Sequence, residues 1–114
     1  MESLPIVAAM LGGLDVSAAV ILSFSGNFER SVIQYDCGLS EPLTVEYINA
    51  APNFLAVLPV AGQKLVFVTV LSASGARYAA GEYEWWTKGS EATLANLTTP
   101  DAAPTACTEI SETP

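Results

Sequence analysis

The side chains that could do chemistry are concentrated between Ser72 and Leu94, in the stretch SASGARYAAGEYEWWTKGSEATL. Ser74 precedes a glycine and carries a hydroxyl that can both donate and accept hydrogen bonds. Lys88 also precedes a glycine, and together with Arg77 it accounts for two of the four basic residues in the chain. A hydroxyl and a cation held side by side on an otherwise acidic protein are suited to binding carboxylates of a partner.

Each of these residues also has an ordinary structural explanation. A serine or a lysine before a glycine is commonly a turn residue in contact with solvent. Glu82 and Glu84 could supply paired carboxylates for glycosidic acid-base chemistry, but that chemistry needs two groups opposed across a cleft. Two positions apart on one strand, they point the same way and are expected to be solvated. A minimal glycosidase built on them is therefore a hypothesis that we do not favour.

The composition of the chain excludes several classes of catalytic and metal site. The chain has 114 residues, of which 51% are hydrophobic, enough for one domain with a modest core. It has no histidine and two cysteines, which removes Ser-His-Asp and Cys-His catalysis and the usual zinc sites. We therefore expect no catalytic residue, no metal and no cofactor. The net charge of -8 repels nucleic acid and attracts basic partners, unless the acidity serves solubility alone.

The elements that position Ser74 and Lys88 are predicted to be strands, because apolar and polar residues alternate with a period of two from Ser31 onward. The expected strands span residues 31–37, 43–47, 53–60, 64–71, 77–80, 82–87 and 92–97. Seven or eight short strands predict an all-β fold, either a small antiparallel barrel or a sandwich. The run 65–71 is apolar at nearly every position, so we expect a central strand covered on both faces. Of the adjacent Trp85 and Trp86, one ring should point inward and the other outward.

Cys37 and Cys107 lie near the two ends of the part that is predicted to fold. An even cysteine count at that separation suits one disulfide in an oxidising compartment, and two unrelated buried thiols are the alternative. The tail at 98–114 is rich in Thr, Ala, Pro and acidic residues, and we expect it to be irregular, with Cys107 tied back to the first strand.

Residues 1–28 differ from the rest, and we expect an atypical leader-like segment there, followed by a domain at 29–114. No apolar run reaches the ~18 residues that span a bilayer, so no transmembrane segment is expected. The first basic residue is Arg30, whereas a secretory signal normally begins with basic residues. No cysteine precedes Cys37, so we expect no lipid anchor. The predicted location is periplasmic or secreted.

Several of these stretches, taken in order, resemble the bacterial C-type lysozyme inhibitor family, whose members are membrane-bound or periplasmic. The likeness runs from about Val32 to Cys107. Its motifs are YDC at 35–37, TVEY at 44–47, SGARY at 74–78 and YEWWTKGSEA at 83–92. The resemblance implies an antiparallel barrel of eight strands, closed by a disulfide between Cys37 and Cys107.

The resemblance also implies a mode of action. The loop with Ser74 would enter the active-site cleft of a C-type lysozyme and hydrogen-bond its catalytic carboxylates, while Lys88 would engage an acidic group nearby. The predicted partner-binding residues are Ser74, Gly75, Arg77, Tyr78, Lys88 and Gly89, with Trp86 as a secondary contact. Inhibition would be competitive and would protect bacterial peptidoglycan.

The competing hypothesis is a periplasmic barrel that binds a cell-wall glycan through Trp86 and Tyr78. Tight binding of a chitooligosaccharide in the absence of lysozyme would favour it. The inhibitor hypothesis makes one strict structural demand, because a single cleft can receive Ser74 and Lys88 only if both lie at the same end of the molecule. Neither the source of the lysozyme nor the oligomeric state follows from the sequence.

Overall fold

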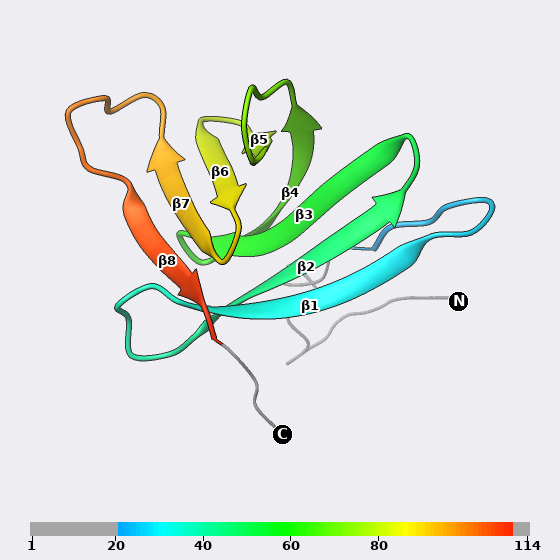
Figure 1. Cartoon of the computed structure of the whole chain (residues 1–114), viewed down its shortest axis with the longest axis horizontal. Helices are drawn as coiled ribbons and strands as arrows, with labels where there is room; N and C mark the ends of the chain where they lie inside the picture. The colour runs from blue at the N-terminus through cyan, green and yellow to red at the C-terminus, as the bar shows by residue number, and fades with distance from the viewer. Residues whose placement is uncertain (1–20, 111–114) are drawn as a thin grey trace, which may run out of the picture.

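A computed structural model describes residues 21–110, and within them eight antiparallel strands form one closed barrel (Figure 1). The strands are β1 (Glu29–Asp36), β2 (Leu43–Ala50), β3 (Asn53–Val60), β4 (Gln63–Val70), β5 (Ala76–Ala80), β6 (Tyr83–Lys88), β7 (Glu91–Asn96) and β8 (Thr105–Glu109). Each strand pairs with its neighbours in the sequence, and β8 returns to pair with β1. The predicted small antiparallel barrel is confirmed. Nowhere in residues 21–110 is there a helix with the length and apolar character that crossing a membrane requires.

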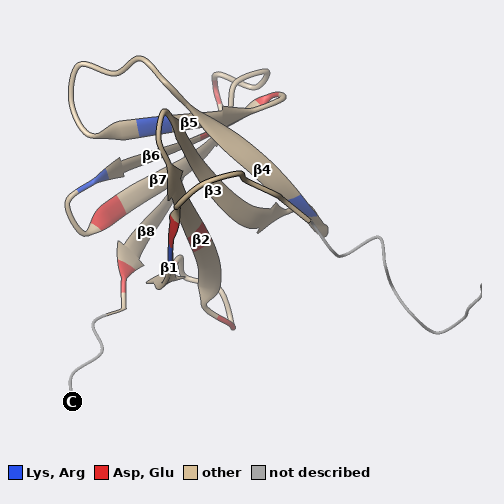
Figure 2. Ribbon diagram, turned by 90° about the vertical axis from the view of Figure 1, so that its right-hand side faces the viewer, with Lys and Arg blue, Asp and Glu red and all other residues tan. Residues whose placement is uncertain are grey.

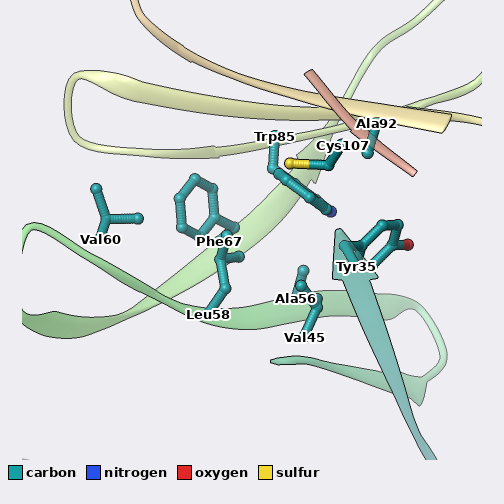
Figure 3. Packing of buried hydrophobic residues seen from close by; sticks show 9 residues of the cluster. All are labelled: Tyr35, Val45, Ala56, Leu58, Val60, Phe67, Trp85, Ala92 and Cys107. Carbon is teal, nitrogen blue, oxygen red and sulfur yellow. The ribbon is translucent and has the colours of Figure 1, made fainter. Parts of the chain in front are cut away.

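Strand alternation places one set of side chains inside the barrel, where they form a single core (Figure 3). The largest fully buried side chains are those of Trp85, Tyr35, Phe67, Leu58 and Val45. The rings of Tyr35 and Trp85 meet edge to face, with centroids 5.1 Å apart. This core lies directly beneath β5 and β6, the strands that carry the chemically interesting residues.

The disulfide between Cys37 and Cys107 is present and joins the first and last strands of the barrel. Cys37 follows β1 directly, and Cys107 lies in β8. Only two residue pairs, Tyr35 with Glu109 and Asp36 with Thr108, connect β1 to β8. The covalent bond therefore reinforces the shortest strand pairing in the barrel.

The expectation of an irregular tail was wrong for residues 105–109, which form β8. Only Cys107 of these five residues is buried, so the segment has no apolar alternation from which a strand could be predicted. β8 forms because both of its edges find partners, four residue pairs with β7 and two with β1. The pairing of β8 with two other strands stabilises it, although its own sequence has no strand pattern.

The expectation that residues 65–71 are covered on both faces was also wrong. Phe67 is buried in the core, but Val68 and Val70 on the outer face are 48% and 42% exposed, and Leu71 is 98% exposed. A second apolar cluster, made by Ile48, Ala50 and Val57 on the outer face of β2 and β3, is packed by Phe24, Leu55 and Val66. Phe24 covers part of the outer face of β2 and β3, but the end of β4 at Val70 stays exposed.

Residues 21–28 precede β1 and contain no strand. Phe24 packs on the outer cluster, and its ring centroid lies 5.2 Å from that of Phe28. The first 20 residues of the predicted leader-like segment lie outside the described residues, so the leader stays a prediction.

Candidate functional site

The loop with Ser74 and the end of β6 with Lys88 lie at the same end of the barrel. β5 and β6 are antiparallel, and Ala76 at the start of β5 pairs with Thr87 near the end of β6. Ser74 comes two residues before that pair and Lys88 one residue after it, so the register brings the two together. The structural demand of the inhibitor hypothesis is met.

Gly75 allows the Ser74 loop to rest directly against β6. Its φ is +67°, a left-handed conformation that favours glycine. A Cβ atom at this position would lie 2.2 Å from the carbonyl oxygen of Thr87 and 2.8 Å from Cγ of Lys88. No residue with a side chain fits unless the loop moves away from β6.

Trp86 connects the Ser74 loop to Lys88. It points to the outside of the barrel, opposite Arg77 on β5. Its indole N–H donates a hydrogen bond to the backbone carbonyl of Ser74 at 3.0 Å. The guanidinium carbon of Arg77 lies 4.2 Å and the Lys88 ammonium nitrogen 4.6 Å from the indole ring centre, both within cation–π range.

These contacts collect positive charge at one end of an acidic protein. In Figure 2 the basic positions of β5 and of the end of β6 lie close together on one side of the barrel. An Arg77 Nη1 atom lies 3.9 Å from Glu84 Oε2, whereas within residues 21–110 Lys88 forms no ion pair and is exposed. The other two basic residues are elsewhere, with Arg30 paired to Glu46 and Lys64 on β4.

Tyr78 lies on the opposite face of β5 from Arg77, in register with Trp85. Its ring centroid is 5.8 Å from that of Tyr47, and desolvation raises the pKa of Tyr78 above its usual value. Tyr78 packs against the core and Trp86 points outward, so the two rings do not share one surface. The glycan hypothesis needs them to do so, and this geometry weighs against it.

A network of polar side chains inside the barrel supports this end of β5 and β6. The Trp85 indole N–H donates to the Tyr47 hydroxyl at 2.9 Å, and the hydroxyls of Tyr47 and Tyr35 are 2.7 Å apart. Burial, followed by the hydrogen bond with Tyr35, raises the pKa of Tyr47 far above the usual value, so this phenol stays neutral. Satisfied buried networks of this kind rigidify a core. The prediction that one tryptophan ring points inward and the other outward is confirmed, and the structure shows that Trp85 is the inner one and Trp86 the outer one.

Glu82 and Glu84 do not form a catalytic pair. Glu82 lies in the turn before β6, where its carboxylate accepts a hydrogen bond from the Asn96 side chain at 2.8 Å. Glu84 is on the outer face of β6 beside Arg77. Each carboxylate is therefore engaged with its own neighbour, and the expectation that both occupy one strand was wrong because β6 begins at Tyr83.

Two hydrogen bonds to the Ser74 carbonyl were not predicted from the sequence. The Ser72 hydroxyl donates to the Ser74 carbonyl at 2.5 Å, so that this carbonyl accepts from both Ser72 and Trp86. Gly89, at φ +59°, lies in the β6–β7 turn with open space around it, and so shapes the turn after Lys88 without a close contact. Alternation predicted that one of the two adjacent tryptophans points outward, but the hydrogen bond of Trp86 depends on the loop conformation.

The fold and the site define a small β-barrel protein, closed by one disulfide, that brings a loop serine next to two cations on the adjoining strands β5 and β6. The family model described as "Membrane-bound lysozyme-inhibitor of c-type lysozyme" matches residues 35–103, and the chain belongs to this family. The resemblance found in the sequence is thereby confirmed. The family is one of inhibitor proteins and not of enzymes.

Three relatives carry the name membrane-bound lysozyme inhibitor of C-type lysozyme. The Pseudomonas aeruginosa protein is 42% identical over 101 residues, which cover 82% of this chain and 80% of that protein. The Cupriavidus necator protein is 48% identical over 65 residues, covering 57% of this chain and 52% of that protein. The Escherichia coli protein is 38% identical over 66 residues, covering 58% of each.

A solved structure is similar to this chain as well. It is the crystal structure of Pseudomonas aeruginosa MliC in complex with hen egg white lysozyme. The TM-score is 0.66 at 42% sequence identity, and the match covers 81% of this chain and 94% of that one. The likeness therefore extends over most of the barrel described above.

Proposed function

We propose that this chain inhibits C-type lysozyme by inserting the Ser74 loop and the adjacent Lys88 into the active-site cleft of the enzyme. The observation that carries the proposal is the placement of both residues at one end of the barrel, in contact with the same indole ring. Family membership supports the target class, since the relatives are named as inhibitors of C-type lysozyme. Inhibition is occlusion of the cleft, without turnover.

The chemistry of the two groups fits such a cleft. A lysozyme active site holds one carboxyl group with a raised pKa and one that stays ionised. The Ser74 hydroxyl can accept a hydrogen bond from the protonated group and donate one to the ionised group. The Lys88 ammonium, free of ion pairs within residues 21–110, supplies a charge-assisted hydrogen bond to a further acidic group.

Charge assists the approach of the two proteins at long range. The net charge of -8 attracts a basic lysozyme, while Arg77 and Lys88 provide a local positive patch for the acidic cleft. The overall charge therefore accelerates encounter, and the local patch orients it. A disulfide is typical of proteins in an oxidising compartment, and on that ground we propose the periplasm or the cell exterior as the site of action.

The test is a cell-wall lysis assay with a C-type lysozyme and increasing amounts of inhibitor. We expect Ser74→Ala and Lys88→Ala each to raise the inhibition constant by ~10- to 100-fold, because each removes hydrogen bonds to charged groups. Ser25→Ala, in the segment before β1, and Lys64→Ala on β4 are matched controls, exposed residues of the same types away from the site. These two controls should inhibit like the unchanged protein.

Two results would reject the contact mode. One is an unchanged inhibition constant in both Ser74→Ala and Lys88→Ala. The other is an equal loss in the Lys64→Ala control, which would mean that any positive charge matters and that the position of Lys88 does not.

A further inference from the structure

We propose that Trp86 is a positioning residue that holds the Ser74 loop and Lys88 as one preformed unit and acts on lysozyme through them. This inference rests on the proposed function and goes beyond it, because it assigns Trp86 a role in preparing the free inhibitor. The alternative is that Trp86 is itself a contact that the enzyme covers. The two roles make different predictions for combined substitutions.

Trp86 uses two separate parts of its side chain for the two connections. The indole N–H binds the Ser74 carbonyl at 3.0 Å and so fixes the backbone that carries the hydroxyl. The ring lies 4.6 Å from the Lys88 ammonium nitrogen. Phenylalanine would keep a ring and lose the donor, whereas leucine would lose both, so substitution can separate the two connections.

The neighbours of Trp86 have few other supports. Ser74 is exposed, the second hydrogen bond to its carbonyl comes from Ser72 of the same loop and not from β6, and the exposed Leu71 provides no apolar anchor. The Arg77 Nε atom is buried and has no hydrogen-bond partner within the described residues, so the ring and Glu84 are what engage the guanidinium. Two like charges are held near one ring because the π face attracts each of them. Removing the ring leaves Arg77 and Lys88 with their mutual repulsion.

Preforming the unit lowers the cost of binding. A lysine side chain has large rotamer freedom, and a loop that is ordered only on binding adds a further entropic penalty. A cation already held beside the ring and a loop already bound to β6 avoid part of both costs. A gain of this kind, with few contacts changed, is expected mainly in the dissociation rate.

The experiment measures association and dissociation rates with hen egg white lysozyme for Trp86→Phe and Trp86→Leu, in the unchanged protein and in Lys88→Ala. We expect Trp86→Leu to weaken binding by ~10- to 30-fold and Trp86→Phe by ~3- to 10-fold, since each lost interaction is modest. In the Lys88→Ala background, Trp86→Leu should cost clearly less than in the unchanged protein. If Trp86→Leu weakens binding by the same factor in the Lys88→Ala background as in the unchanged protein, the proposal is overturned and Trp86 is a direct contact.

A second measurement does not depend on lysozyme. In the free protein, the side-chain methylene protons of Lys88 should show ring-current shifts in NMR spectra, and Trp86→Leu should abolish them while those of Lys64 stay unchanged. Lys88 signals at ordinary positions in the unchanged protein would overturn the positioning role. If the protein does not inhibit lysozyme but the shifts are present, the proposed function fails and the preformed unit stands.

Discussion

The outer surface of the barrel has two contrasting regions. On β5–β7 the outward row Arg77, Trp86 and Thr93 crosses the three strands, and Arg77 contacts both the Trp86 ring and Glu84. On β2–β4 the outward row Ile48, Leu55 and Val68 is apolar. The same barrel interior supports both regions, so the difference lies in what each surface presents to its surroundings.

The comparison shows that exposure alone does not identify a site. Val68 is 48% exposed, and its neighbours in register, Leu55 and Ala79, are apolar. In the β5–β7 region, by contrast, a loop carbonyl, an indole and two cations meet within a few ångströms. We therefore expect function to be sensitive to changes at β5 and β6 and insensitive to changes at β2–β4.

The largest expected effect comes from Gly75. Gly75→Ala places a Cβ atom 2.2 Å from the Thr87 carbonyl oxygen, so the Ser74 loop must move away from β6. We expect inhibition to weaken by ~30- to 100-fold, because both the Ser74 position and the bond to Trp86 are lost. Titration of the lysis assay measures the change.

Gly62→Ala in the β3–β4 turn is the matched control for this comparison. Gly62 has a positive φ of 81°, but a Cβ atom there meets nothing within 4 Å. Both variants share the backbone strain of alanine at positive φ, and only Gly75→Ala has the collision. Equal inhibition by the two variants would show that the close approach of the loop to β6 is unimportant.

The fold was largely predictable from the sequence because alternation and turn glycines dominate β1–β7. β8 was not, since its only buried residue is Cys107 and its stability comes from pairing on both edges. The outer face of β4 was misinterpreted for a related reason. An apolar run indicates that a strand could be covered, but it does not reveal whether any part of the chain reaches it.

The residues of the site could be predicted from the sequence, but the contacts between them could not. Ser74 and Lys88 follow from residue types and from the family motifs, and the register of β5 and β6 then brings them together. Tyr78 follows Arg77 directly, so alternation places the two on opposite faces, and the structure shows that the face of Tyr78 is the inner one. The bond from Trp86 to the Ser74 carbonyl depends on the loop conformation at Gly75, which no periodic pattern encodes.

A smaller effect is expected from Phe24, and on stability instead of inhibition. Phe24→Ala removes a partly buried ring from the cluster of Ile48, Ala50 and Val57. We expect the free energy of unfolding to fall by ~1 to 2 kcal/mol, less than for a fully buried phenylalanine. Urea denaturation gives the stability, and the lysis assay should be unchanged under native conditions. A loss of inhibition in the folded variant would contradict the separation between the two regions.

The smallest effect is expected from Val68→Thr, which tests whether the apolar region is covered when lysozyme binds. The two side chains have similar shapes, and half-exposed positions of this kind change stability by no more than about 0.5 kcal/mol. If only the β5–β7 end engages the enzyme, the association and dissociation rates should both equal those of the unchanged protein. A hydroxyl buried without a partner in an interface would instead weaken binding, because its desolvation is not compensated. A faster dissociation rate in Val68→Thr would therefore place β4 inside the interface and remove the contrast on which the assignment of the site depends.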